Sequence, residues 1–304
     1  MIPLLSNRRA KTLNQYSEIK EAEKGAWVSI GSYLGLTAIK LIAGYWFVSS
    51  ALVADGYNNL TDIVASVAVL IGLRISQKPP DQDHPYGHFR AETIAALIAS
   101  FIMASVGIQV LISAVKSLFD TVERTPNLLA AVVAGFSALC MGLVYIYNSR
   151  LAKKIGSQAL HAAAKDNLSD ALVSVGSAIG IIGAQFGLPW LDPVAALAVG
   201  IIICKTAWDI FYSCTHALTD GFNKEELSSL SVTIAKTEGV KKIKDIKARI
   251  HGSKVLLDVI VLVDSDLSLK ESHRICDEIE RRMRRKHNIM SVHVHVEPLE
   301  EGKS

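Results

Sequence analysis

The stretches YNNLTDIVASVAVLIG (57–72) and KDNLSDALVSVGSAIG (165–180) each place polar and acidic residues at the head of a long apolar run. Their cores, NNLTD and DNLSD, are nearly identical motifs that lie more than a hundred positions apart. A carboxylate inside an apolar environment is unfavourable and usually marks a functional site. The repeated motif therefore predicts a helical membrane protein that brings acidic groups together within its helix bundle.

Composition divides the chain into an apolar part and a polar part. Half of the 304 residues are hydrophobic while 20% are charged, and the mean hydropathy is +0.31. Charges are confined to short interruptions between residues 25 and 212, but occur throughout the region after residue 220. We expect a polar tail (1–24), a transmembrane domain (25–214) and a soluble domain (215–304).

Six segments are apolar and close to the ~20 residues that a bilayer-spanning helix requires. They cover residues 27–48, 51–75, 91–118, 128–148, 160–186 and 191–212. Any one of them could be a buried core helix, but six in succession would need an implausibly large apolar core. The sequence therefore predicts an all-α, six-helix membrane domain.

The distribution of Lys and Arg predicts the orientation of these spans. The tail and the loops after the second and fourth spans are basic, whereas the three loops on the opposite side contain only Arg124. Both termini are therefore expected in the cytoplasm, in a multi-pass protein of the plasma or inner membrane. The first 25 residues have no apolar segment typical of a cleaved signal peptide.

The two copies of the repeated motif contain four residues with oxygen-bearing side chains that could bind a cation. Asn58 and Asp62 are four positions apart, as are Asp166 and Asp170, so each pair shares one face of its helix. If the second and fifth spans pack together, four oxygen donors converge inside the bilayer. Helix caps or interhelical hydrogen bonds are the structural alternative, and suit Asn59, Thr61, Asn167 and Ser169. Three clustered carboxylates favour a cation site, because like charges repel unless a cation or protons intervene.

With these pairs and the loop DQDHPYGHFRAE (81–92), residues 25–298 resemble the cation diffusion facilitator family. The resemblance implies a six-span metal exporter with a cytoplasmic ferredoxin-like domain, usually a homodimer, which exchanges a divalent metal for protons. It also implies that Asn58, Asp62, Asp166 and Asp170 form the transport site. No organic cofactor is implied.

The resemblance and the ligand chemistry together indicate the metal. Zinc-exporting family members commonly place a histidine in this quartet, whereas this sequence supplies three carboxylates and one amide. Oxygen ligands suit Mn²⁺, Mg²⁺ and Ca²⁺, and imidazole suits Zn²⁺. We expect manganese as the transported ion, with iron(II) second and zinc third.

Two further groups of residues match family metal positions. Asp81, His84 and His88, spaced three and four apart, would form a second metal site, unless both histidines are simply solvated. In the cytoplasmic domain, His273, His293, His295 and Glu297 are possible ligands. However, Lys244 and Ile260 lie near positions where zinc-exporting members have histidines, so a single metal or a purely structural dimer interface are alternatives.

The cytoplasmic region predicts a small α/β domain. Helical patterns cover 224–236 and 269–286, and strand patterns cover 242–250, 254–263 and 290–296. This order matches the ferredoxin-like module that the resemblance implies. The basic run RRMRRKH (281–287) is typical of a helix C-terminus, so no nucleic-acid partner is expected.

Enzyme motifs are missing from the sequence. It contains neither HExxH nor GxSxG, so we expect no catalytic residues, and the family resemblance implies a secondary active transporter. A membrane-anchored metal sensor and a passive cation channel stay open as alternatives, although a dense carboxylate cluster would hold a divalent ion too tightly for fast conduction.

Overall fold

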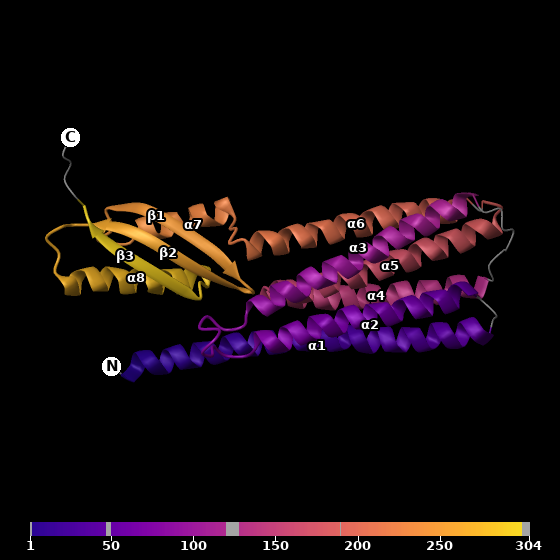
Figure 1. The fold of residues 1–304 in the computed structure, drawn as a ribbon, viewed down its shortest axis with the longest axis horizontal. Helices are drawn as coiled ribbons and strands as arrows, with labels where there is room; N and C mark the ends of the chain where they lie inside the picture. Colours follow the sequence, from indigo (N-terminus) through magenta and orange to yellow (C-terminus); the bar gives the residue numbers. More distant parts are fainter. Residues whose placement is uncertain (1, 47–49, 120–127, 189, 300–304) are drawn as a thin grey trace. The chain divides into compact units, whose positions relative to one another are not determined.

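The computed structural model describes residues 2–46, 50–119, 128–188 and 190–299. Within these ranges, the side chains of residues 2–19, 44, 50–55, 58, 61, 118–119, 184 and 192 lie outside the described part. The chain forms two compact units, Met1–Cys214 and Thr215–Ser304, which are drawn in Figure 1.

Long helices make up the described part of the first unit (Figure 1). They are α1 (Ile2–Trp46), α2 (Ser50–Ser76), α3 (Arg90–Phe119), α4 (Leu128–Ile155), α5 (Gln158–Gln185) and α6 (Leu191–Leu218). The helix α1 begins at Ile2, well before the expected first span, so the basic tail forms the N-terminal part of the same helix.

Four of these helices contain segments that are long and apolar enough to cross a membrane, among the residues that the structure describes. The segments are Lys20–Ala43, Arg90–Ser117, Leu128–Ile155 and Pro193–Leu218. The remaining two helices, α2 and α5, contain the two copies of the repeated acidic motif. In α5, Lys165, Asp166 and Asp170 lie within six positions, which lowers its hydropathy at the site of interest.

Small residues let the long helices approach closely. An added Cβ atom at Gly72 of α2 would lie 2.2 Å from the Cβ atom of Ala95 of α3. Glycine is therefore required for this contact between α2 and α3. Helix α5 packs against α1, α2, α3 and α4, so its polar face is enclosed by neighbouring helices.

The second unit is a three-stranded sheet with two helices. Its elements are α7 (Lys224–Ala235), β1 (Lys242–His251), β2 (Lys254–Val263), α8 (Leu269–His287) and β3 (Ser291–Pro298). The strand order is β1-β2-β3, with β1 antiparallel and β3 parallel to β2. This helix–strand–strand–helix–strand order confirms the predicted small α/β domain, and the long helices of the first unit agree with the predicted α-helical membrane domain.

Both helices of the second unit cover one face of the sheet. Ile234 of α7 and Ile279 of α8 are fully buried with Val261 of β2 in one apolar core. Capping supports both helices: Asn223 accepts a hydrogen bond from the backbone of Glu226, and Ser268 forms a capping box with Glu271. The opposite face of the sheet carries Asp258 of β2 and His293, His295 and Glu297 of β3.

Candidate functional site: a buried carboxylate cluster

Three aspartates converge between α2 and α5. Oxygen atoms of Asp62, Asp166 and Asp170 lie within 4.8 Å of one another. Asp62 is 2% exposed, and the other two carboxylates are partly buried. The four-residue spacing in α5 places Asp166 and Asp170 on one face, and the packing of α2 against α5 brings Asp62 to them. A group of this geometry can hold a divalent cation through oxygen atoms alone.

The fourth predicted ligand, Asn58, lies on α2 one turn before Asp62. Its side chain is outside the described residues, so its role at the cluster stays a prediction.

A fully buried tyrosine on α1 reaches the same cluster. The hydroxyl of Tyr33 donates a hydrogen bond to Asp170 and lies 3.4 Å from Oδ2 of Asp166. It accepts a hydrogen bond of 3.0 Å from the side-chain amide of Asn167. Tyr33 was not among the residues predicted from the sequence. Its contact with Asp170 depends on the packing of α1 against α5.

Further along α1, Lys40 is a second buried polar residue that the sequence reading missed. It is 2% exposed, and its Nζ atom lies 3.4 Å from Oδ1 of Asn59 on α2. Ser29, Tyr33, Thr37 and Lys40 are all buried and follow one another at intervals of three or four residues. This helical spacing within an apolar span was the available signal, because it indicates a polar stripe that faces the bundle.

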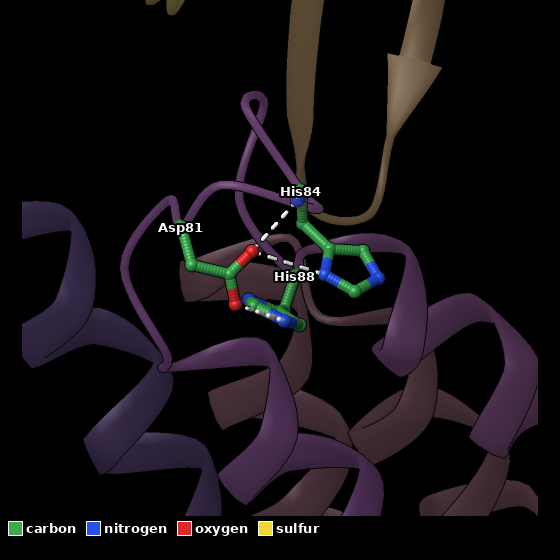
Figure 2. Close-up of side chains that lie close together, drawn as sticks. All are labelled: Asp81, His84 and His88. Carbon is green, nitrogen blue, oxygen red and sulfur yellow. Dashed lines mark hydrogen bonds and ion pairs between the residues drawn. The ribbon is translucent and has the colours of Figure 1, made fainter.

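The loop between α2 and α3 brings together the second predicted group. Ligand atoms of Asp81, His84 and His88 lie within 4.8 Å of one another. Nδ1 of His84 is 3.2 Å from Oδ1 of Asp81, and Nε2 of His88 is 3.4 Å from Oδ2 of Asp81, so both imidazoles turn toward one carboxylate (Figure 2). One oxygen and two nitrogen donors form a more zinc-like set than the intramembrane cluster.

Hydrogen bonds from backbone N–H groups to Asp81 and the backbone conformation of Gly87 shape this loop. Oδ1 of Asp81 accepts hydrogen bonds from the backbone N–H groups of Asp83, at 3.1 Å, and His84, at 2.7 Å. The His84 N–H holds the pKa of the Asp81 carboxyl below its usual value, and the two imidazoles act in the same direction. Gly87 has a φ of 81°, a conformation that glycine adopts without strain, and it allows the turn into α3.

The possible ligands of the cytoplasmic domain are not gathered into a group within the described chain. His273 on α8 lies 3.8 Å from Asp277, and His293 lies 3.9 Å from Asp258. Glu297 lies 3.7 Å from His295 and forms a shorter ion pair of 2.6 Å with Lys244. Metal binding by these four residues therefore stays a prediction.

Two family models match the chain almost from end to end. The cation efflux transmembrane domain matches residues 26–219, and the cytoplasmic domain of cation efflux proteins matches residues 222–299. The boundary between the two matches lies close to the division between the two structural units.

Several bacterial proteins are similar over nearly their full length. The chain is 61% identical to the manganese efflux system protein MneS of Bacillus subtilis, over 95% of this chain and 100% of that protein. It is 52% identical to the uncharacterized transporter YdbO of the same organism, over 94% and 99%. The manganese efflux system protein MneP, also of Bacillus subtilis, is 33% identical over 91% of this chain and 96% of that protein.

Proposed function

The chain belongs to the cation diffusion facilitator (cation efflux) family, whose members are transporters. We propose that it exports Mn²⁺ through the carboxylate cluster. The observation that supports this most directly is the convergence of Asp62, Asp166 and Asp170 from two membrane helices within 4.8 Å. The transported ion would bind to these carboxylates, with Asn58 as a fourth ligand. Divalent cation efflux is the activity of the family, and the choice of manganese is our inference.

The ligand set favours manganese over zinc. Zn²⁺ binds more tightly than Mn²⁺ to most protein sites, so a manganese protein must discriminate through ligand type and geometry. The cluster offers carboxylate oxygens and no imidazole or thiolate among its described members. The similar protein MneS is named as a manganese efflux protein, which supports the same choice. Iron(II) and zinc are the next candidates.

Protons are the proposed counter-ion. Three carboxylates held close together in a membrane cannot all remain charged when the metal leaves, because their mutual repulsion is no longer offset. Protons taken up from the opposite side would neutralise them and release the ion, in a cycle of alternating access. This exchange of a metal ion for protons would distinguish an antiporter from a passive channel or a membrane-anchored sensor, neither of which couples metal movement to proton movement.

The protein is a multi-pass membrane protein, and we place both termini in the cytoplasm of a cell that carries it in its plasma membrane. The basic residues of the tail and of the loops after α2 and α4 support this orientation. The match to the cytoplasmic domain of cation efflux proteins supports a homodimer. The Asp81, His84 and His88 group would then lie on the cytoplasmic side as a second metal site.

The test is ion flux in vesicles that contain the purified full-length protein. Mn²⁺ uptake should saturate, should proceed faster when a pH gradient is imposed, and should be lost in Asp166→Ala. Asp209→Ala is the matched control, because Asp209 is a carboxylate of α6 that is exposed and outside the cluster. Full Mn²⁺ transport by Asp166→Ala would disprove the assignment of the site. Non-saturating flux that ignores the pH gradient would indicate a channel.

A further inference from the structure

A network of fully buried polar side chains connects α1, α4 and α5 beside the carboxylate cluster. Ser29 and Tyr33 of α1, Asn148 of α4 and Asn167 of α5 are each 0% exposed. Oδ1 of Asn167 accepts hydrogen bonds of 3.0 Å from both Ser29 and Asn148, and Asn148 also donates to Oγ of Ser29 at 2.8 Å. Within the described part of the chain, Oδ1 of Asn148 has no hydrogen-bond partner, whereas the hydrogen bonds among Ser29, Asn148 and Asn167 restrain the three side chains against one another.

The carboxylate of Asp170 fixes the direction of these hydrogen bonds: an ionised carboxylate only accepts, so the Tyr33 hydroxyl donates to it and accepts from the NH₂ group of Asn167. Because the carbonyl of Asn167 accepts from Ser29 and Asn148, its NH₂ group faces Tyr33 and donates to the hydroxyl. Turning over the amide of Asn167 alone would place the NH₂ groups of Asn148 and Asn167 against each other. The hydroxyl of Tyr33 thus has its acceptor position filled by Asn167. Its own proton is directed at the carboxylate of Asp170.

We propose that Tyr33 is a positioning residue that sets the metal preference of the cluster by holding one oxygen of Asp170. This inference rests on the proposed transport function and adds a residue that is not one of the predicted ligands. With Oδ2 of Asp170 engaged by Tyr33, the carboxylate presents its other oxygen to an ion. Its position is then determined by α1 and α4 as well as by α5.

Such a restraint discriminates between metals through geometry. A small tetrahedral Zn²⁺ site needs its ligands drawn close around the ion, whereas a larger site completed by water suits Mn²⁺. A carboxylate anchored to this network resists being drawn inward. Removing the hydroxyl frees Asp170 to rotate, so the cluster can contract around Zn²⁺ while losing its preformed arrangement for Mn²⁺. Partners of this kind commonly change metal affinity or activity by ~10–100-fold when they are removed.

The test compares Tyr33→Phe with Tyr147→Phe in the full-length protein. Phenylalanine keeps the buried ring and removes only the hydroxyl. Tyr147 is an exposed tyrosine of α4, so its variant controls for loss of a tyrosine hydroxyl elsewhere in the membrane domain. Dissociation constants for Mn²⁺ and Zn²⁺ would be measured by titration calorimetry, and KM and maximal rate by uptake into vesicles.

We expect Tyr33→Phe to weaken Mn²⁺ binding about tenfold, to raise KM for Mn²⁺ more than it lowers the maximal rate, and to shift the Mn²⁺/Zn²⁺ preference toward zinc. Ser29→Ala, which keeps the Tyr33 hydroxyl but loosens Asn167, should shift the preference in the same direction by a smaller factor. Tyr147→Phe should match the wild type.

Two results would overturn the inference. An unchanged Mn²⁺/Zn²⁺ ratio in both Tyr33→Phe and Ser29→Ala would show that the hydroxyl does not control selectivity. An equal loss of affinity for both metals would indicate a direct ligand or a purely structural role. Neither result affects the proposed function, which is tested separately by wild-type Mn²⁺ flux and its loss in Asp166→Ala.

Discussion

The Nζ atom of Lys244 on β1 lies 2.6 Å from Oε2 of Glu297 on β3, across the intervening strand β2. A fixed cation thus occupies one oxygen of a carboxylate that the family resemblance suggested as a metal ligand. Because both side chains are partly exposed, the pair stabilises the domain only slightly. A metal ion that used this oxygen of Glu297 would have to displace the positive charge of Lys244.

We predict that replacing this cation with a carboxylate creates dependence on a divalent metal. In an Asp166→Ala background, Lys244→Glu should lower the free energy of unfolding by about 1 kcal/mol in EDTA, since it removes an ion pair and adds repulsion. Added Zn²⁺ or Mn²⁺ should restore the melting temperature. Lys224→Glu, at an exposed lysine of α7, is the control. An equal response of both variants to metal would contradict the prediction.

A second prediction concerns Asn58 and zinc. Asn58→His introduces an imidazole nitrogen one helical turn before Asp62, and imidazole suits Zn²⁺. We expect the ratio of Zn²⁺ to Mn²⁺ transport to rise about tenfold in reconstituted vesicles. Asn58→Gln, which retains an amide oxygen, should change the ratio less. The idea that oxygen-only ligands determine selectivity fails if the histidine variant keeps the wild-type ratio.

Proton release on metal binding is the third prediction. Calorimetric titration of Mn²⁺ into the protein in buffers of different ionisation enthalpy gives the number of protons released per ion. Because metal and protons compete for the same carboxylates, we expect at least one proton per ion in the wild type and a smaller number in Asp166→Asn. A value of zero near neutral pH would be incompatible with antiport through this cluster.

The loop aspartate gives a pH prediction. The pKa of Asp81 is lowered in the folded protein, chiefly by the N–H of His84. Its charged form therefore stabilises the fold above the unfolded pKa of about 3.9, and this contribution is lost as the pH falls through the lower folded pKa. Thermal unfolding should find Asp81→Asn less stable than the wild type near neutral pH, with the difference shrinking in acid.

Asp83→Asn is the matched control for that experiment, since Asp83 is an exposed aspartate of the same loop. A stability difference between the wild type and Asp81→Asn that does not change with pH would show that the carboxylate charge is irrelevant to the loop.

The sequence was sufficient to predict the long helices from the length of their apolar segments, whereas the approach of Asp62 to Asp166 and Asp170 also depended on the packing of α2 against α5. The four-residue spacing of Asp166 and Asp170 places them on one face wherever the helix lies. Tyr33 could not be assigned in this way. Its contact with Asp170 depends on how α1 packs against α5, and single-helix spacing does not describe that relationship.

The pairing of Lys244 with Glu297 was unpredictable for a different reason. Side chains alternate between the faces of a strand, but the pairing of β1 with β2 shifts at an irregularity between Ile243 and Asp245. One extra residue changes which face the following side chains occupy. The sequence pattern alone therefore did not show that Lys244 would reach across the sheet to Glu297.

The burial of Lys40 against Asn59 has a consequence for biogenesis. A lysine within a membrane helix raises the free energy of insertion, by up to about 2.5–3.5 kcal/mol at the helix centre, and the partner of Lys40, Asn59, is synthesised only with α2. Helices α1 and α2 should therefore leave the translocon as a hairpin. Asn148 of α4 likewise meets its partner Asn167 only after α5 has been synthesised.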